Sequence, residues 1–548
     1  MRFNILIGGQ AGQGIDAAST ILAKSLIKLG FYAFNYRDYG SFIRGGHNFN
    51  VISFSENPIY SHQLYFDFAI LLDDNSYNYH KNEFKKECIF ITEFDLNEKN
   101  LVKVDASNII SKLNAKPLVK NSILIGAFLK ALGLPVEPLL ESIKEEWKDE
   151  KNLEAAREGY ENSKEVMKLS YPRKNRKRIF IDGTSATGLA AIYYGLDFYF
   201  AYPMTPATPL LHFLSSLREK YDFKTIQLEN EIAVANATLG ASYAGAISML
   251  GTSGGGFDLM TEAISLQGMT EVPLVVYLAQ RAGPSTGLPT YTMQADLNLA
   301  LNCGHGEFPR VVISPGDSKD AFYKTLEAFY LAYKYGTVSI ILSDKHLAES
   351  WFTFDGFEEP KIKGNRFLLE NVENFKTYEI TKDFVPKRTV PELAIVKANS
   401  YEHDELGFTT EDKNITKMMQ EKRKGKFETL EKEVKENFET VKVFGKGENL
   451  IISFGSTKGA ILDALPYLKD CRYLQIIYLS PFPKETVKKE IENSKNVIIV
   501  ENNSTGQLGR LIREKVGVFE AKEILKYDGR PFTYDEIIEN VSRILKER

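Results

Sequence analysis

Near its beginning the chain reads FNILIGGQAGQG (Phe3 to Gly14), an apolar run followed by a glycine-rich turn. Apolar residues then recur at helical spacing from Ile15 to Leu29, and a β-rich run, YAFNY, comes next. A strand, a glycine turn, a helix and another strand in this order are typical of a βαβ unit. The beginning of the chain therefore predicts an α/β fold with a mostly parallel sheet and flanking helices.

The same alternation continues further along the chain. Between residues 178 and 385, helical patterns separate short apolar runs that read RIFIDG, FYFAYPMTP, AISMLGTSGGG, PLVVYLAQ, RVVISPG and SIILSD. Such unbroken apolar runs are typical of parallel strands that are covered on both faces of a sheet. Ligands in these sheets bind beyond the carboxyl ends of the strands, and several of the runs end in Gly, Pro, Ser or Thr. We therefore expect a ligand site in this part of the chain.

The whole pattern predicts three doubly wound, mostly parallel α/β domains and one connecting arm. We place the domains at residues 1–172, 178–385 and 445–548, and the arm at residues 386–444. The arm begins as a polar, turn-rich stretch and continues as a highly charged helix. That helix carries an apolar stripe, which consists of Phe427, Leu430, Val434 and Phe438.

Composition excludes several classes of protein. The 548 residues are 43% hydrophobic and 26% charged with a net charge of −4, which is ordinary for a soluble protein with several cores. There is no basic excess for nucleic acid, and the basic run at 173–178 predicts a solvated linker. Cys88, Cys303 and Cys471 are too few and too scattered for a disulfide framework or for a metal cluster held by this chain alone. The few cysteines and the absence of a signal-peptide pattern favour the cytoplasm, and the uncharged stretch 232–257 is too interrupted to span a membrane.

Candidate chemistry gathers in the second segment. In AYPMTPATP, from Ala201, three prolines hold Thr205 on a stiff loop at a strand end. Glu229 and Glu231 precede an almost uncharged helix, where a carboxylate is either a favourable first-turn group or a functional one. Arg281 follows an apolar strand and could clamp a carboxylate, although a lone arginine is usually a surface residue. The glycines from Gly254 offer backbone amides to an anion or a cofactor.

The first segment has two glycine turns of its own. Gly9, Gly12 and Gly14 give the spacing G-x-x-G-x-G, which does not match the dinucleotide fingerprint. A second turn, RGGHN, adds a cation at Arg44. These loops fit a phosphate or pantetheine contact about as well as a purely structural role. The seven histidines form no metal-binding spacing, so we expect no metal on this chain.

Taken in order, these motifs resemble the 2-oxoacid:ferredoxin oxidoreductases, over nearly the whole chain. The closest likeness is to an alpha subunit with a gamma domain fused at its N-terminus, of the 2-oxoglutarate synthase type. The motifs that carry the resemblance are GGQAGQG, RGGHN, YPMTPATP, ENEIAVANATLGASYAGA, TSGGG, QRAGPSTGLPT, YEHDELG with EKRKGK, and ENNSTGQL. One departure is GTSATGLAA, from Gly183, where Thr184 and Ser185 stand in place of the family's asparagine and glutamate.

The resemblance implies a fold with a thiamine diphosphate pyrimidine-binding domain and a transketolase C-terminal-like domain. It also implies an enzyme that oxidatively decarboxylates a 2-oxoacid to acyl-CoA and CO₂ and passes electrons to ferredoxin. By this resemblance Glu231 bonds the cofactor's aminopyrimidine, with Glu229 as runner-up, and Thr205 bonds substrate or cofactor near the reacting carbon. Arg281 holds the substrate carboxylate. Tyr202, Pro203 and Gly254 complete the thiamine side, and Gly9, Gly12, Gly14 and Arg44 are possible contacts for CoA.

Missing motifs point to a partner. The sequence lacks the Gly-Asp-Gly motif with which thiamine enzymes usually bind the diphosphate and Mg²⁺. It also lacks a cysteine-rich motif for an iron–sulfur cluster. We therefore expect this chain to supply half of an active site, with Mg²⁺ and a [4Fe-4S] cluster on a beta subunit. Among substrates we rank 2-oxoglutarate ahead of pyruvate and branched-chain 2-oxoacids. The alternatives are a CoA- or nucleotide-binding subunit of a complex with different chemistry and a self-sufficient thiamine carboligase or transketolase.

Overall fold

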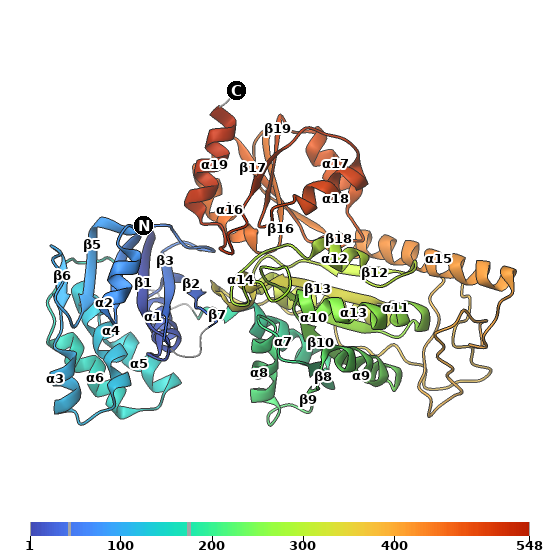
Figure 1. Ribbon diagram of the computed structural model, residues 1–548, viewed down its shortest axis with the longest axis horizontal. Helices are drawn as coiled ribbons and strands as arrows, with labels where there is room; N and C mark the ends of the chain where they lie inside the picture. Colours follow the sequence, from blue (N-terminus) through green and yellow to red (C-terminus); the bar gives the residue numbers. More distant parts are fainter. Residues whose placement is uncertain (1, 42–44, 173–176, 547–548) are drawn as a thin grey trace.

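The computed structural model describes residues 2–41, 45–172 and 177–546 of the chain. Three β-sheets, each covered by helices, make up the molecule (Figure 1). Most of the first sheet lies at the left of the view in blue, most of the second lies near the centre in green and yellow, and the third lies at the top in orange and red. The α/β class with several mostly parallel sheets is thereby confirmed, and the four domain boundaries stay a prediction.

The first sheet has eight strands in the order β6-β5-β4-β1-β3-β2-β14-β7. Pairing is parallel from β1 through β4 and β5 to β6, and antiparallel from β1 through β3, β2 and β14 to β7, so this sheet is mixed. The strands are β1 Arg2–Gln10, β2 Tyr32–Asp38, β3 His47–Ser55, β4 Phe66–Leu71, β5 Phe84–Thr92, β6 Leu101–Lys103, β7 Ile179–Asp182 and β14 Trp351–Phe354. The helices of this part are α1 Ile15–Lys28, α2 Asp74–His80, α3 Ala106–Lys112, α4 Lys120–Ala131, α5 Glu137–Glu146 and α6 Glu150–Glu161.

The core of the first sheet follows the alternation of side chains along its strands. Ile5 and Ile7 of β1 pack into one buried cluster together with helices α1 and α4, and Leu6 packs into a second cluster on the opposite face. All three side chains are fully or almost fully buried. Side chains on both faces of β1 are therefore buried, which explains why the sequence of this strand is an unbroken apolar run.

The second sheet has seven strands in the order β18-β12-β13-β11-β10-β8-β9, and every pairing except that of β18 is parallel. Its strands are β8 Phe198–Ala201, β9 Lys224–Gln227, β10 Ser248–Thr252, β11 Leu274–Gln280, β12 Arg310–Ile313, β13 Val338–Asp344 and β18 Tyr478–Ser480. Its helices are α7 Gly183–Tyr194, α8 Thr208–Leu217, α9 Glu231–Tyr243, α10 Gly254–Leu259, α11 Thr261–Thr270, α12 Leu297–Asn302, α13 Ser318–Tyr335 and α14 Lys345–Glu349. Alternate residues of β11 enter two different cores, as expected for a sheet covered on both faces.

The third sheet has the order β15-β17-β16-β19-β20 and is parallel except at β15. Its strands are β15 Val441–Gly445, β16 Asn449–Phe454, β17 Cys471–Ile476, β19 Asn496–Glu501 and β20 Lys522–Leu525. Its helices are α16 Lys458–Ala464, α17 Lys484–Glu492, α18 Gln507–Val516 and α19 Tyr534–Lys546. Leu450 and Ile452 of β16 share a core with Leu274 and Val276 of β11, so the second and third sheets are packed as one body.

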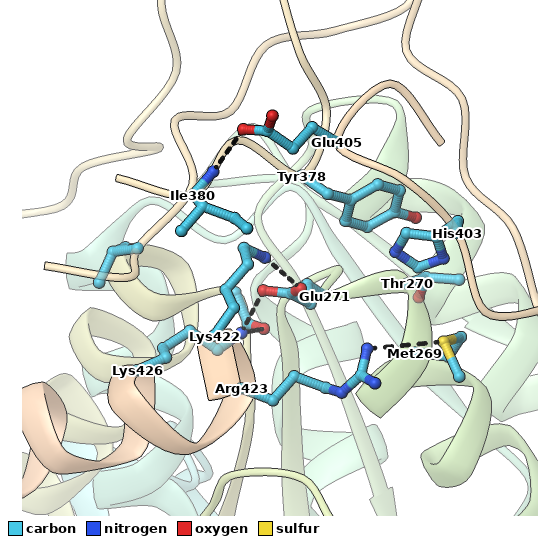
Figure 2. Close-up of polar contacts among 12 residues, drawn as sticks. Met269, Thr270, Glu271, Tyr378, Ile380, His403, Glu405, Lys422, Arg423 and Lys426 are labelled. Atoms are coloured by element: carbon cyan, nitrogen blue, oxygen red, sulfur yellow. Dashed lines mark hydrogen bonds and ion pairs between the residues drawn. The ribbon is translucent and has the colours of Figure 1, made fainter. Parts of the chain in front are cut away.

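The arm is held to the second sheet by buried charges. Its helix α15, Lys413–Asn437, buries Leu430 and Val434 in the core of the second sheet, as the apolar stripe predicts. Figure 2 shows Glu271, just after α11, between the ammonium groups of Lys422 and Lys426, and all three side chains are at most 3% exposed. The two lysines lower the pKa of Glu271 to about 2, whereas burial lowers the pKa of Lys426 to about 8.

The uncharged stretch around α9 and β10 is part of a globular core. Among the described residues no helix is both long enough and apolar enough to cross a membrane. The stretch 232–257 is instead divided among α9, β10 and α10, and its polar residues lie within these elements as well as between them.

Candidate active site

The candidate residues of the second segment lie at one edge of the second sheet. Strands β8, β10, β11 and β13 are parallel neighbours, so their carboxyl ends meet at the same edge. Ala201, Thr252 and Gln280 are the last residues of the first three of these strands. The segments that follow them carry Tyr202, Pro203, Thr205, Gly254 and Arg281, and Glu231 begins α9 after the neighbouring parallel strand β9. This is the edge at which ligands bind in open α/β sheets.

Glu231 is buried at the beginning of α9 without serving as its cap. The side chain of Asn230 caps the helix by accepting a hydrogen bond from the amide of Ala233. Glu231 is 3% exposed, and its Oε1 has no hydrogen-bond partner among the described residues. A buried carboxylate oxygen without a donor is costly unless something else bonds it. By contrast, Glu229 is exposed, which favours Glu231 over its runner-up.

The glycine turn after β10 lies directly against this carboxylate. A Cβ atom placed on Gly256 would stand 2.7 Å from Oε1 of Glu231 and 2.3 Å from Oγ1 of Thr252. A Cβ atom on Gly254 would stand 2.4 Å from Oδ2 of Asp296. Ser253, which begins the turn, is fully buried, and its hydroxyl has no partner among the described residues. The run of glycines therefore lets the turn pack against two carboxylates that a larger residue would displace.

Arg281 and Thr205 are in direct contact. Nη1 of Arg281 donates a hydrogen bond of 2.8 Å to the backbone oxygen of Thr205, so the arginine is fixed to the proline-rich loop. Nε of Arg281 is buried and has no acceptor among the described residues, and burial lowers the pKa of this guanidinium. Tyr202 and Pro203 are exposed at the beginning of the same loop. Arg281 therefore keeps part of its donor fork available for a ligand carboxylate.

Asp296 belongs to the same site and was missed by the sequence analysis. Burial raises the pKa of its carboxyl to about 6, Arg281 opposes that rise, and Asp258 adds to it. Asp296 therefore lies against Gly254, at the beginning of α10, and its carboxylate is attracted by the charge of Arg281. The sequence gives little sign that Asp296 is functional, since it stands alone in QADL after a loop without charge. The one indication is that this loop follows the strand that ends at Gln280.

A chain of close approaches thus joins the predicted residues. Glu231 adjoins Gly256, Gly254 adjoins Asp296, and Arg281, which attracts Asp296 by charge, is hydrogen-bonded to the loop of Thr205. Three buried polar atoms at these positions have no hydrogen-bond partner among the described residues: Oε1 of Glu231, Oγ of Ser253 and Nε of Arg281. The carboxylate of Glu231, the hydroxyl of Ser253 and the guanidinium of Arg281 can together hold a ligand with a ring nitrogen and a carboxylate.

The residues that depart from the family pattern form a helix cap. Asp182 accepts hydrogen bonds from the amide of Ser185, at 2.6 Å, and from its hydroxyl, at 3.0 Å, and so caps α7. Thr184 is buried, and its hydroxyl lies 3.3 Å from that of Tyr277. The exchanged residues thereby stabilise the first turn of α7.

The glycine loops of the first segment form a separate group. Gly9 ends β1 with Gln10, Gly12 has a positive φ of 95° with open space around it, and Gly14 caps α1 in the left-handed region. Arg44 lies outside the described residues. The structure brings none of these glycines into contact with the candidate active site, and their link to CoA stays a prediction.

The expectation that this chain holds no metal likewise stays a prediction. Among the described residues, no cluster of three or more histidine, cysteine, aspartate or glutamate side chains has the arrangement of a metal site.

Comparison with known families agrees with this geometry. Residues 189–422 match the family described as "Pyruvate flavodoxin/ferredoxin oxidoreductase, thiamine diP-bdg", and residues 4–162 match "Pyruvate ferredoxin/flavodoxin oxidoreductase". The first match contains Tyr202, Pro203, Thr205, Glu231, Gly254 and Arg281. The thiamine-binding character of the second segment is therefore confirmed, although the role of each residue is not tested by these matches.

Full-length relatives and a solved structure extend the comparison. The chain is 33% identical to the 2-oxoacid:ferredoxin oxidoreductase subunit alpha of Saccharolobus solfataricus, over 100% of this chain and 98% of that relative. It is 31% identical to the 2-oxoglutarate synthase subunit KorA of Archaeoglobus fulgidus, over 61% of this chain and 89% of that relative. The structure of the 2-oxoglutarate:ferredoxin oxidoreductase from Magnetococcus marinus with 2-oxoglutarate, coenzyme A and succinyl-CoA bound has a TM-score of 0.90 to it, at 28% identity and 99% coverage of both chains. The chain therefore belongs to the family of 2-oxoacid:ferredoxin oxidoreductases, and it corresponds to the alpha subunit of these multi-subunit enzymes.

Proposed function

We propose that this chain supplies the pyrimidine side of a thiamine diphosphate site in an oxidoreductase that acts on 2-oxoglutarate with coenzyme A. The observation that carries the proposal is the buried Oε1 of Glu231, which has no hydrogen-bond partner among the described residues and lies against Gly256. Thiamine diphosphate, when bound, supplies the carbanion that attacks the keto carbon of the substrate. A second subunit would hold the diphosphate, Mg²⁺ and a [4Fe-4S] cluster, and ferredoxin would take the electrons.

Each side chain of the site has a defined part in the proposal. Glu231 Oε1 would form a hydrogen bond with a ring nitrogen of the aminopyrimidine and hold a proton there. Arg281 would offer Nε to the substrate carboxylate while Nη1 stays on Thr205. Asp296 would keep the guanidinium in place by charge attraction. The choice of 2-oxoglutarate rests on the Magnetococcus marinus enzyme, whose structure holds that acid.

The overall activity is tested on the chain purified anaerobically with the partner that accompanies it. We expect viologen reduction that depends on CoA and is fastest with 2-oxoglutarate in a panel of 2-oxoacids. A different preferred acid would correct the substrate alone. No reduction with any acid, by a preparation whose partner retains its cluster, would contradict the proposal and favour the CoA- or nucleotide-binding alternative.

The role of Glu231 is tested by Glu231→Gln, with Glu229→Gln as the matched control. Because glutamine cannot exchange the proton, we expect kcat for viologen reduction to fall by about 100- to 10,000-fold. Glu229 is exposed and two residues away, so Glu229→Gln should leave kcat within about twofold of the wild-type value. Wild-type turnover in Glu231→Gln would exclude this glutamate from the reaction.

The role of Arg281 is tested by Arg281→Ala, with the exposed Arg218→Ala as the control. Loss of a charged hydrogen bond costs about 1.5–3 kcal/mol, so kcat/KM should fall by about 10- to 150-fold, mainly through KM for the 2-oxoacid. Steady-state kinetics with each 2-oxoacid measures the effect. An unchanged KM and kcat would show that the substrate carboxylate is held elsewhere.

A further inference from the structure

A cavity of about 410 Å³ lies away from the candidate active site, between the first sheet and helix α8. Side chains from α1, β2, β3, α5, α14 and β14 line it, together with Pro209 in the first turn of α8. Its size falls within the range of sites for small molecules. The proposed mechanism does not use any of its residues.

Two buried acceptors in this cavity lack hydrogen-bond donors. Asn35 is 2% exposed and its Oδ1 has no partner, and Glu349 is 5% exposed and its Oε2 has none, among the described residues. The nearest cationic atoms to that Oε2 are Nζ of Lys345 at 3.7 Å and Nη1 of Arg37 at 4.0 Å, which is beyond hydrogen-bonding distance. One donor, Nε of Arg37, is also without a partner. The cavity therefore lacks donors more than it lacks acceptors.

The charges around the cavity leave a deficit of one positive charge. The carboxylates that line it are those of Asp16, Glu146, Asp182 and Glu349, and the cations on or beside them are Arg37, Lys345 and Lys24. Four negative charges against three positive charges give a net charge of −1. A site with this balance attracts a single cation and repels a polyanion such as CoA.

Aromatic rings complete the lining. Trp147, at the end of α5, and Trp351, in β14, both face this cavity as part of its lining, and they are the only two tryptophans of the chain. Tryptophan rings offer a large apolar area to which an alkyl group can pack. A ligand that carries one positive charge, several N–H donors and a short apolar tail matches all three features.

We propose that this cavity is a binding site for a small aliphatic primary ammonium ion. Its N–H groups would donate to Oδ1 of Asn35 and Oε2 of Glu349, its charge would balance the carboxylates, and its alkyl tail would contact the tryptophans. The site is independent of the proposed catalytic function. It lies at the junction of the first sheet with α8, the helix that follows the loop of Thr205.

The test is a fluorescence titration of the full chain with propylammonium chloride at constant ionic strength. Because both tryptophans line the cavity, we expect a saturable change in their emission. Tetramethylammonium chloride carries the same charge without an N–H donor, so it should give no saturable change. No saturation with propylammonium, an equal response to tetramethylammonium, or saturation with CoA alone would each overturn the proposal.

Variants locate the binding. Glu349→Gln should weaken propylammonium binding at least about tenfold, and Asp16→Asn, at the half-exposed side of the cavity, should weaken it about threefold without loss of fold. The control is Glu358→Gln, whose side chain is 88% exposed and which does not line the cavity. An unchanged dissociation constant in both Asp16→Asn and a folded Glu349→Gln would overturn the proposal.

Discussion

At the scale of single residues, the candidate site depends on the absence of side chains as much as on their presence. Gly256 leaves the space that the carboxyl of Glu231 occupies, and Gly254 leaves the space of the Asp296 carboxyl. Gly240, in the middle of α9, has no neighbour within 4 Å of its missing Cβ. The glycines at the beginning of α10 and Gly240 of α9 should therefore respond in opposite ways to the same substitution.

We predict that Gly256→Ala destabilises the chain by about 1–3 kcal/mol, because its Cβ would stand within 2.3 Å of Thr252 Oγ1. It should also lower kcat, since Glu231 must move. Gly240→Ala, the matched control, should stabilise the chain by up to about 1 kcal/mol, because alanine is the better helix former. Urea unfolding and turnover of both variants measure this. Equal effects of the two substitutions would contradict the packing of the turn against Glu231.

At the scale of the elements, α15 depends on a buried group of two cations and one anion. Glu271 balances only one of Lys422 and Lys426, and both lysines are at most 1% exposed. Removing the anion would leave two buried charges without a partner, whereas removing one lysine would leave a neutral pair. The two kinds of substitution therefore differ strongly in cost.

We predict that Glu271→Gln costs about 3–5 kcal/mol, whereas Lys426→Met is nearly neutral at pH 7. The pH dependence follows from the lowered pKa of Lys426, which is about 8 in the folded chain and 10.5 for an ordinary lysine. The unfolded chain holds a proton that the folded chain has released, so stability should rise from pH 8 to pH 10.5. Lys426→Met should lose this rise, and Lys424→Met, at an exposed position of the same helix, should keep it. Urea unfolding across this pH range decides, and a rise that persists in Lys426→Met would contradict the assignment.

Local sequence pattern predicts the elements of this fold better than it predicts their pairing. The unbroken apolar runs of β11 and β13 indicate buried strands because burial on both faces is a local property of the sequence. The bridge between Asn35 and Trp351 joins strands that are far apart in the chain, and no periodicity encodes it. The same holds for β18, which leaves the third segment to pair with β12. Local pattern also gave Glu231, an acid before an apolar helix, but not Asp296, whose environment comes from Gly254 and Arg281.

At the scale of the whole molecule, side chains of the third segment tie the three sheets together. Lys458, at the beginning of α16, forms ion pairs of 2.6 Å with both Asp317 and Asp320 beside the second sheet. Asp463 of the same helix pairs at 3.1 Å with Arg2 of β1 in the first sheet and accepts a hydrogen bond from Ser61, between β3 and β4. Helix α16 therefore contacts both other sheets through buried charges.

We predict that Lys458→Met lowers stability by about 3–5 kcal/mol, because it leaves two carboxylates buried without their cation. Hydrogen exchange should accelerate in α16 and the first turn of α13 but not in β6, which is an edge strand of the first sheet. Lys488→Met is the control, since that lysine is 47% exposed and forms only a loose pair on α17. Unchanged exchange in α16 would show that Lys458 does not hold the third sheet in place.

The pairing of β14 with β2 also has a consequence for the protein during its synthesis. Strand β2 ends at Asp38, but its outer neighbour β14 begins at Trp351, roughly 300 residues later. A ribosome that adds about 5–20 residues per second needs about 15–60 s to make that stretch. During this time the nascent first sheet presents an unpaired edge, the feature through which strands of separate chains associate. The speed of translation between these two points therefore determines how long each new chain is exposed to aggregation.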